Sequence, residues 1–279
     1  MGFDKKLAEA VSEAGNYLCI GLDPDPQRIP DFPGLGVESG TEPDKIKQFC
    51  QALIESTQQY CCAYKPNLAF FEALGPKGLK VFHEVCQAIP DNKIVIADAK
   101  RGDIGHTAGK YAEAFFDRFN VDALTLNPLM GMDTLSPYLS RPEKALFVLA
   151  LTSNTGASDF LMQSSGDFPM LASYIAHKLH VQQKTSDTRL GMVVGATQAN
   201  LAAEVLSQYP DAPLLIPGIG AQGGSIEQLK KLLKNHKGQP LVSVSRSIMY
   251  AGEQQGARTF DNYIAHAAEQ ASRLANQLQ

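Results

Sequence analysis

The sequence predicts an α/β protein whose eight parallel strands close into a (β/α)₈ barrel. Two observations support this prediction. Eight short apolar segments recur along the 279 residues, and amphipathic stretches with helical signals separate them. Eight strand–helix units in a chain of this length are typical of the barrel, and a doubly wound open sheet is the main structural alternative.

The predicted strands follow one another from the N-terminus to the C-terminus. They are 17–23, 61–67, 93–100, 123–128, 145–152, 190–196, 214–220 and 241–247. Between the first two, Thr41 to Asp44 resembles a capping box, with Pro43 early in the first turn. Apolar residues then keep helical spacing from Ile46 to Ile54, so the stretch predicts a helix.

No linker interrupts this pattern, so we expect residues 1–279 to form a single domain. Two connections are long, at about 24–43 and 153–170, and both follow the C-terminal end of a strand. That end carries the active site in a barrel, which makes both loops candidate lids. A tolerated surface insertion explains the first loop equally well.

Composition excludes several classes of function. The formal net charge is -4, and no basic stripe is present, so we expect no nucleic-acid partner. No apolar run is long enough to cross a membrane, and the N-terminus has no apolar targeting segment. The five cysteines include the adjacent pair Cys61 and Cys62, which indicates buried free thiols and a reducing cytoplasm. The histidines form no metal-ligand pattern, so we expect no metal.

Polar residues collect where the predicted strands end. They are Asp23, Lys65, Asn67, Asp98, Lys100, Asn127, Thr152 and Ser153. Any one of them alone would be read as a surface residue. In a barrel, however, these strand ends meet at one mouth, and two lysines with two aspartates in so small a volume are difficult to explain as packing.

The stretch DAKRGDIGHT, residues 98–107, carries the densest charge. Asp98 and Lys100 lie two residues apart, so in an extended strand both side chains leave the same face. Asp103 comes beyond the strand, where the loop decides its direction. We therefore expect a paired charged face at the end of the third strand.

A phosphate site is predicted after the seventh and eighth strands. PGIGAQGG, residues 217–224, lets backbone N–H groups approach a ligand, and Gln222 adds a side-chain amide. Arg246 follows the eighth strand. A guanidinium beside a glycine-rich loop at strands seven and eight matches the phosphate position common in barrel enzymes.

Five segments together resemble a known family. DAKRGDIGHT, AYKPNLAFFE, CIGLDPDP, PGIGAQGG and VSRSI resemble the orotidine 5′-monophosphate decarboxylases, in their long-loop bacterial branch, across residues 17–248. The most specific element is the D-x-K-x-x-D pattern of Asp98, Lys100 and Asp103 combined with Lys65. The glycine-rich loop is less specific.

The resemblance implies an activity and a catalytic network. The activity is the decarboxylation of orotidine 5′-monophosphate to uridine 5′-monophosphate in de novo pyrimidine biosynthesis, without a cofactor. Lys65, Asp98, Lys100 and Asp103 would form an alternating charge network in which Lys100 protonates C6. Fixed positive charge near C6 suits this chemistry, because no adjacent carbonyl delocalises the developing negative charge.

The resemblance also implies substrate contacts and a partner. Asp23 would hold the ribose hydroxyls, Ser153 the pyrimidine edge, and Gln222 and Arg246 the phosphate. Asn67, at the same mouth, is a further candidate for substrate binding. Asp103, with Ile104 and Thr107, would reach into the neighbouring subunit's site, which implies a homodimer.

Three alternatives stay open from the sequence. The first is a magnesium-dependent sugar-phosphate decarboxylase or aldolase of the same barrel superfamily, which Lys65 disfavours because a lysine at that position repels a cation. The second is a Schiff-base aldolase that uses Lys65 or Lys100. The third is a phosphate-ligand binding protein without catalysis.

Overall fold

The computed structural model describes residues 1–32, 40–196, 199–219 and 225–279. Its eight strands form a closed barrel in chain order, and each described pairing between strands is parallel. The predicted barrel is thus confirmed, and the open-sheet alternative is wrong. The strands are β1 (Leu18–Leu22), β2 (Ala63–Pro66), β3 (Ile94–Arg101), β4 (Ala123–Leu126), β5 (Ala145–Leu151), β6 (Arg189–Val194), β7 (Leu214–Pro217) and β8 (Pro240–Val244).

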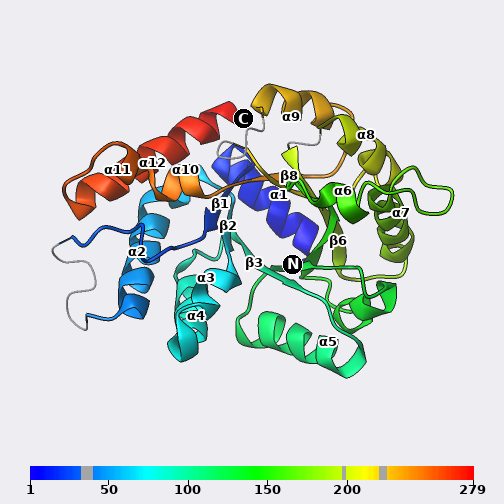
Figure 1. Ribbon diagram of the computed structural model, residues 1–279, viewed down its shortest axis with the longest axis horizontal. Coiled ribbons are helices and arrows are strands. Elements are labelled where there is room, and N and C mark those ends of the chain that lie inside the picture. The colour runs from blue at the N-terminus through cyan, green and yellow to red at the C-terminus, as the bar shows by residue number, and fades with distance from the viewer. Residues whose placement is uncertain (33–39, 197–198, 220–224) are drawn as a thin grey trace. The chain divides into compact units, whose positions relative to one another are not determined.

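Helices alternate with these strands along the chain (Figure 1). They are α1 (Phe3–Ala14), α2 (Glu42–Thr57), α3 (Leu68–Glu72), α4 (Gly78–Ala88), α5 (Gly105–Ala112), α6 (Ala157–Phe160), α7 (Leu171–Gln183), α8 (Ala199–Gln208), α9 (Ile226–Leu233), α10 (Arg246–Met249), α11 (Ala251–Gln254) and α12 (Phe260–Gln277). Shorter helical turns are η1 (Gln58–Tyr60), η2 (Gly75–Lys77), the π-helical η3 (Glu113–Arg118) and η4 (Met132–Tyr138).

The strands form where the sequence has uninterrupted apolar runs. All five residues of β1 are buried, and so are six of the seven in β5. Strands of a parallel sheet are covered on both faces, so they lack the polar alternation of a half-exposed strand. The observed strands mostly end earlier than predicted, because most of the predicted segments included polar residues or glycines that follow the strand.

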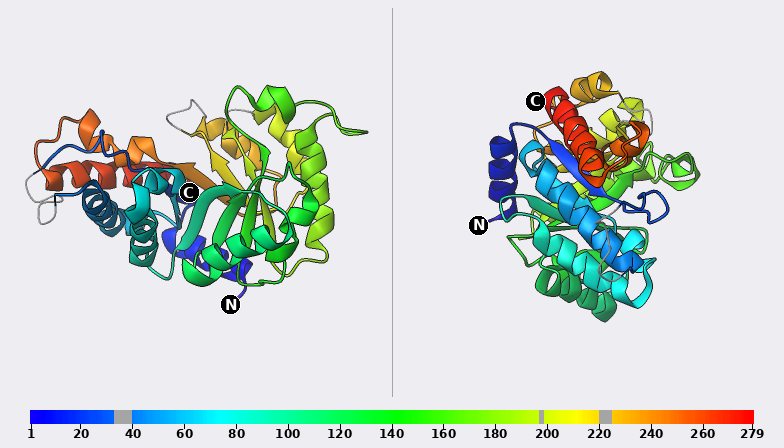
Figure 2. Two further views of the ribbon diagram at one scale, coloured as in Figure 1. Left: turned by 60° about the horizontal axis from the view of Figure 1, so that its bottom comes forward. Right: turned by 90° about the vertical axis from the view of Figure 1, so that its left-hand side faces the viewer.

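The described chain divides into two compact units. The first unit comprises residues 1–8 and 99–243, and the second comprises 9–98 and 244–279. In the first, β4 to β8 lie side by side in chain order (Figure 2). The second contains β1, β2 and β3 as far as Asp98. The single domain over 1–279 stays a prediction.

Each unit has its own aromatic packing. In the first unit, the rings of Phe3 and Phe147 meet edge to face, with centroids 6.4 Å apart. In the second, Tyr263 of α12 meets Phe49 of α2 in the same way at 5.9 Å, and both residues are buried. Edge-to-face pairs of this kind add to the stability that burial of the rings supplies.

The helix predicted after Thr41 is present, but its start differs from the capping box. Thr41 is the N-cap residue of α2, and Lys45 N donates to its carbonyl oxygen at 3.1 Å. The Thr41 hydroxyl bonds the Asp44 carboxylate at 2.5 Å rather than a backbone N–H. A side-chain pair thus replaces the reciprocal backbone bonds of a capping box.

The two long loops differ in what can be described. In the loop at 24–43, residues 33–39 lie outside the described residues. The loop at 153–170 contains α6 and an antiparallel bridge between Ser165 and Phe168. Its end is tied back by Leu171 N, which donates to Gln163 O at 2.7 Å. This second loop is therefore built on its own hydrogen bonds.

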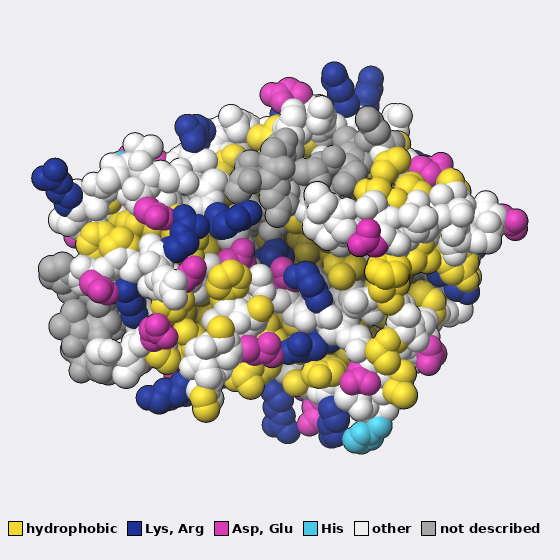
Figure 3. Space-filling view, in the orientation of Figure 1, with side chains coloured by type: hydrophobic (Ala, Val, Ile, Leu, Met, Phe, Trp, Pro, Cys, Tyr) yellow, Lys and Arg dark blue, Asp and Glu magenta, His cyan; other side chains and the backbone are white. Residues whose placement is uncertain are grey.

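Other expectations from composition can be compared with the structure. All five cysteines are buried thiols that form no disulfide, which confirms the prediction. Among the described residues, no helix has the length and apolar character needed to span a membrane. Basic and acidic side chains are interspersed over the face drawn in Figure 3.

Candidate active site

A buried ion pair joins the ends of β2 and β3. Lys65 is 7% exposed and Asp98 is 8% exposed, and Lys65 Nζ donates to Asp98 Oδ2 at 2.5 Å. The parallel register that pairs Ala63 with Ile94 continues to a bridge between Asn67 and Asp98, which brings the two strand ends together. Since an isolated buried charge is strongly unfavourable, each group depends on the other.

The surroundings keep Lys65 charged. Burial by itself lowers the pKa of Lys65, because it disfavours the ammonium form. The carboxylates of Asp98 and Asp23 act in the opposite direction and prevail, so the pKa of Lys65 lies above its ordinary value. Lys65 therefore contributes a fixed positive charge at the end of β2, opposite the negative charge of Asp98.

Asp23, directly after β1, has a carboxylate oxygen that accepts no hydrogen bond from the described residues. Its Oδ1 atom is buried and has no hydrogen-bond partner among the described residues. The backbone around it is fixed, because the Tyr250 hydroxyl donates to Asp23 O at 2.9 Å and accepts from Asp25 N at 2.8 Å. A buried acceptor without a donor is a suitable place for a ligand hydroxyl.

Lys100 lies near the end of β3 in an unusual backbone conformation. Its φ is 47°, and among the described non-glycine residues Asn120 alone shares a positive φ. The Lys100 side chain is exposed. Asp103 follows the strand, is half-buried, and accepts a hydrogen bond from Ile104 N through Oδ1 at 2.8 Å.

The predicted catalytic residues fall in both units. Lys65 and Asp98 belong to the second unit, in which the Asp23 carboxylate also acts on Lys65. Lys100 and Asp103 belong to the first. The structure thus brings Lys65, Asp98 and Asp23 together, and the complete four-residue network stays a prediction.

Three predicted substrate-binding residues have well-defined places. Thr107 is exposed in the first turn of α5. Ser153 follows β5 against Gly195, where a Cβ atom would come within 2.8 Å of the Ser153 Cα atom. Asn67 is the N-cap of α3, and its Oδ1 accepts from Ala69 N at 3.3 Å. The Asn67 side chain thus has a structural role that the sequence analysis missed.

The predicted phosphate site is described only in part. Arg246 is exposed and begins α10, which follows β8. Gly218, after β7, has φ of 102°, a conformation that favours glycine. Gln222 lies outside the described residues.

Sequence analysis also missed Thr125. This residue is buried in the middle of β4, and its hydroxyl oxygen accepts from both Ala99 N at 3.0 Å and Lys100 N at 2.9 Å. A threonine in a strand carries no functional signal by itself, because β-branched residues are common there. Among the described residues, no group of three histidine, cysteine, aspartate or glutamate side chains is arranged to hold a metal ion.

Comparison with known proteins identifies the family. The orotidine 5′-phosphate decarboxylase / HUMPS family matches residues 16–259. The chain belongs to this family. Orotidine 5′-phosphate decarboxylase from Parabacteroides distasonis is 39% identical over 268 residues, which cover 95% of this chain and 93% of that protein.

Solved structures of relatives have the same fold. The OMP decarboxylase of Leishmania donovani is 33% identical with a TM-score of 0.80, and the match covers 100% of this chain and 99% of that one. The UMP synthase of the same organism is 35% identical with a TM-score of 0.81. This chain matches only 56% of that longer protein.

Proposed function

We propose that the chain decarboxylates orotidine 5′-monophosphate to uridine 5′-monophosphate in de novo pyrimidine biosynthesis, as a carboxy-lyase that needs no cofactor. Membership of the family and the full-length likeness to orotidine 5′-phosphate decarboxylases support the reaction. The observation that carries the mechanism is the buried ion pair of Lys65 and Asp98. Asp98 carries one charge of this pair, and along the chain it lies two residues before Lys100, the residue that we assign as proton donor.

Lys100 supplies the positive charge and the proton in this proposal. Loss of CO₂ leaves an electron pair at C6 in an sp² orbital, and an ammonium group nearby stabilises that charge more than it stabilises the substrate. The Lys100 ammonium then gives a proton to C6, forming the C–H bond of the product. Its exposed side chain is accessible to a ligand.

The remaining charged residues orient Lys100. Asp98 and Asp103 attract its ammonium group by their negative charge, and Lys65 holds Asp98 in place through the buried ion pair. Asp98 near the substrate carboxylate also raises the energy of the bound substrate, a contribution that depends on desolvation. The ion pair between Lys65 on β2 and Asp98 on β3 supports this assignment of charges.

The substrate's other groups are assigned to residues at the strand ends. Asp23 accepts from the ribose hydroxyls, for which its buried unpartnered Oδ1 atom is suited. Ser153 and Asn67 contact the pyrimidine side, and Gln222 and Arg246 hold the phosphate. The phosphate is remote from C6, so its binding energy aligns the ring and closes the long loops.

We further propose that the chain works as a cytoplasmic homodimer in which Asp103, with Thr107, completes the neighbouring subunit's site. Ile104, beside Asp103, is an apolar side chain with 56% of its surface exposed, which supports a contact that covers it. Subunit mixing tests this. Lys100→Ala and Asp103→Ala are each expected to be inactive.

Mixing the two variants would rebuild one intact site in every hybrid dimer, because Lys100 and Asp103 of that site come from different subunits. Half of the dimers are hybrids after random exchange, so activity should recover to about a quarter of the wild-type value. No recovery, in a mixture shown to exchange subunits, would contradict the shared site.

The reaction is tested by following the ultraviolet absorbance of orotidine 5′-monophosphate with purified protein, before and after exhaustive treatment with a metal chelator. Turnover that the chelator leaves unchanged supports the proposal. Turnover lost with the metal and restored by Mg²⁺ would favour the metal-dependent relatives. Nucleotide binding without turnover would indicate a binding protein.

A further inference from the structure

The backbone conformation of Lys100 needs an explanation. Its φ of 47° places it in the left-handed region, which is unfavourable for a residue with a Cβ atom because that atom comes too close to the following carbonyl oxygen. Lysine has no short polar side chain that would stabilise this conformation locally. Such a residue persists only when its surroundings fix it, and these residues cluster at functional sites.

Thr125 provides that fixation through its hydroxyl oxygen. The N–H groups of Ala99 and Lys100 both donate to Thr125 Oγ1, at 3.0 and 2.9 Å. Along an extended strand, consecutive N–H groups point to opposite sides and cannot converge on one atom. They converge here, so the backbone at Ala99 departs from the extended conformation and the hydroxyl oxygen fixes the peptide plane that leads into Lys100.

Two further contacts hold the same segment against β4. Asn127 N donates to Arg101 O at 2.8 Å. A Cβ atom at Gly102 would lie 2.8 Å from Asn127 O, so the residue at this position must be glycine for the backbones to come so close. The backbone on both sides of the Lys100 side chain is therefore tied to residues 125–127.

We propose that Thr125 is a positioning residue, whose hydroxyl oxygen holds the left-handed backbone at Lys100 and so aims Nζ at the reacting carbon. The inference rests on the proposed role of Lys100. Packing alone does not require a hydroxyl at this position. Thr125 is 1% exposed, and a valine side chain of the same shape would fill the same space in the strand. What threonine adds is an acceptor for two adjacent amides.

Removing the acceptor should displace the lysine without emptying the site. In Thr125→Val, the amides of Ala99 and Lys100 lose their partner, and the backbone relaxes toward the extended conformation. Side chains alternate between faces along an extended strand, so this relaxation turns Lys100 away from its direction in the left-handed turn.

The test separates chemistry from binding in the intact protein. Thr125→Val should lower kcat by about 100-fold, the size expected for a misplaced catalytic group, while KM and the dissociation constant of uridine 5′-monophosphate change little. Thr125→Ser keeps the oxygen and should retain most of kcat. Thr125→Cys puts a weak sulfur acceptor in its place and should fall between the two.

Thr188 supplies the matched control. It is also buried in the first unit, and its hydroxyl accepts from Arg141 N at 2.9 Å and donates to Tyr138 O at 2.6 Å. Thr188→Val should therefore lower the melting temperature as Thr125→Val does, but leave kcat unchanged. A loss of kcat that follows stability in both variants would mean that Thr125 is only structural.

The outcomes distinguish this inference from the proposed function. Substantial activity in Lys100→Ala would overturn the proton-donor role, whatever Thr125 does. An inactive Lys100→Ala together with a normal kcat in Thr125→Val would overturn the positioning role alone. If Thr125→Val does not fold, Thr125→Cys decides: a normal kcat in that folded variant overturns the proposal.

Discussion

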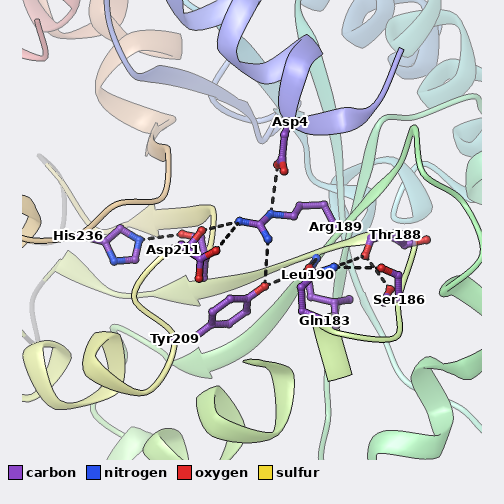
Figure 4. A network of polar contacts seen from close by, with 10 residues as sticks. Asp4, Gln183, Ser186, Thr188, Arg189, Leu190, Tyr209, Asp211 and His236 are labelled. Carbon is purple, nitrogen blue, oxygen red and sulfur yellow. Dashed lines mark hydrogen bonds and ion pairs between the residues drawn. The ribbon is translucent and has the colours of Figure 1, made fainter. Parts of the chain in front are cut away.

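Two charged clusters of the molecule are built in opposite ways. At the start of β6, Arg189 is surrounded by protein partners: Asp4, Tyr209 and Asp211 all contact its guanidinium (Figure 4). At the end of β2, Lys65 makes one short ion pair with Asp98, and the nearby Asp23 keeps a buried oxygen that accepts no hydrogen bond from a described residue.

The difference separates a charged cluster whose contacts stabilise the fold from one that leaves an atom available to a ligand. Arg189 donates to Asp211 O at 2.5 Å, and its Nε atom lies 3.2 Å from Asp4 Oδ1 as an ion pair whose angle does not suit a hydrogen bond. Each nitrogen of this guanidinium thus faces an oxygen of the protein, in a hydrogen bond or an ion pair. An incomplete cluster at strand ends suits a ligand, and in barrel enzymes the C-terminal strand ends carry the chemistry.

The largest expected effect comes from Lys100→Ala, which removes the proposed proton donor while leaving Lys65 and Asp98 paired. We expect turnover to fall by at least about 1,000-fold, within the range that general acid catalysis and charge stabilisation contribute together. Because Lys100 is exposed, thermal stability should change little. The measurements are single-turnover kinetics and uridine 5′-monophosphate binding, and substantial residual activity would refute the assignment.

Lys65→Met should damage both stability and activity. It leaves the Asp98 carboxylate buried without its partner, and breaking a buried ion pair by removing one partner is unfavourable by about 3 to 5 kcal/mol. Denaturant unfolding measures this loss. Turnover should also fall, because Asp98 loses the ammonium group that holds its carboxylate in place.

Lys144→Met is the matched control for Lys65→Met. Lys144 is equally buried at 7%, but its Nζ atom donates to a neutral partner, Asn120 Oδ1, at 3.3 Å. Burial lowers the pKa of Lys144, so its charge is already disfavoured. We expect a small change in stability and unchanged turnover, and equal losses in both variants would contradict the special role of the Lys65 pair.

Arg189→Met should affect stability alone. Its hydrogen bond to Asp211 O contributes about 1 to 2 kcal/mol, and the contacts with the exposed carboxylates of Asp4 and Asp211 add little because solvent screens them. Urea unfolding and steady-state kinetics on the same preparation check this. A fall in kcat at a temperature where the variant is fully folded would remove the contrast between the two clusters.

The sequence predicted the strands well because burial on both faces leaves a strong signal. Every predicted strand is present, and Lys65 and Asp98, which the prediction placed at strand ends, form a buried ion pair. The buried thiols followed equally well from the apolar segment that contains Cys61 and Cys62. These features depend on local composition, which one sequence displays directly.

The remaining features depend on contacts between distant segments or on side-chain geometry. From the sequence, Thr125 is an ordinary strand residue, and no sequence pattern predicts the left-handed backbone conformation of Lys100. Asn67 caps a helix, and the Thr41 hydroxyl bonds a side chain where a backbone N–H was expected, because several acceptors compete within one turn. Which acceptor a given N–H or hydroxyl group bonds depends on distances and angles in the folded chain, which the sequence does not display.

The smallest expected effect is a pH dependence at His236, near Arg189 in Figure 4. The His236 Nε2 atom lies 2.8 Å from Ala212 O, while Nδ1 is buried without a partner among the described residues. Nε2 therefore carries the proton of the neutral ring. A second proton would bind Nδ1, where no described residue offers an acceptor. Burial accordingly lowers the pKa of His236.

This shift makes the folded protein less stable in mild acid. Below the unfolded-state pKa of about 6.5, the unfolded chain binds a proton that the folded chain does not, so the free energy of unfolding falls as the pH drops from 7 toward the lower folded pKa. His236→Gln keeps a donor for Ala212 O and should flatten this slope, measured by urea unfolding between pH 5.5 and 7.5. His106→Gln, at an exposed position in the first turn of α5, controls for the loss of an imidazole. An unchanged slope in His236→Gln would mean that other groups set the acid response, and that the Arg189 cluster is insensitive to pH.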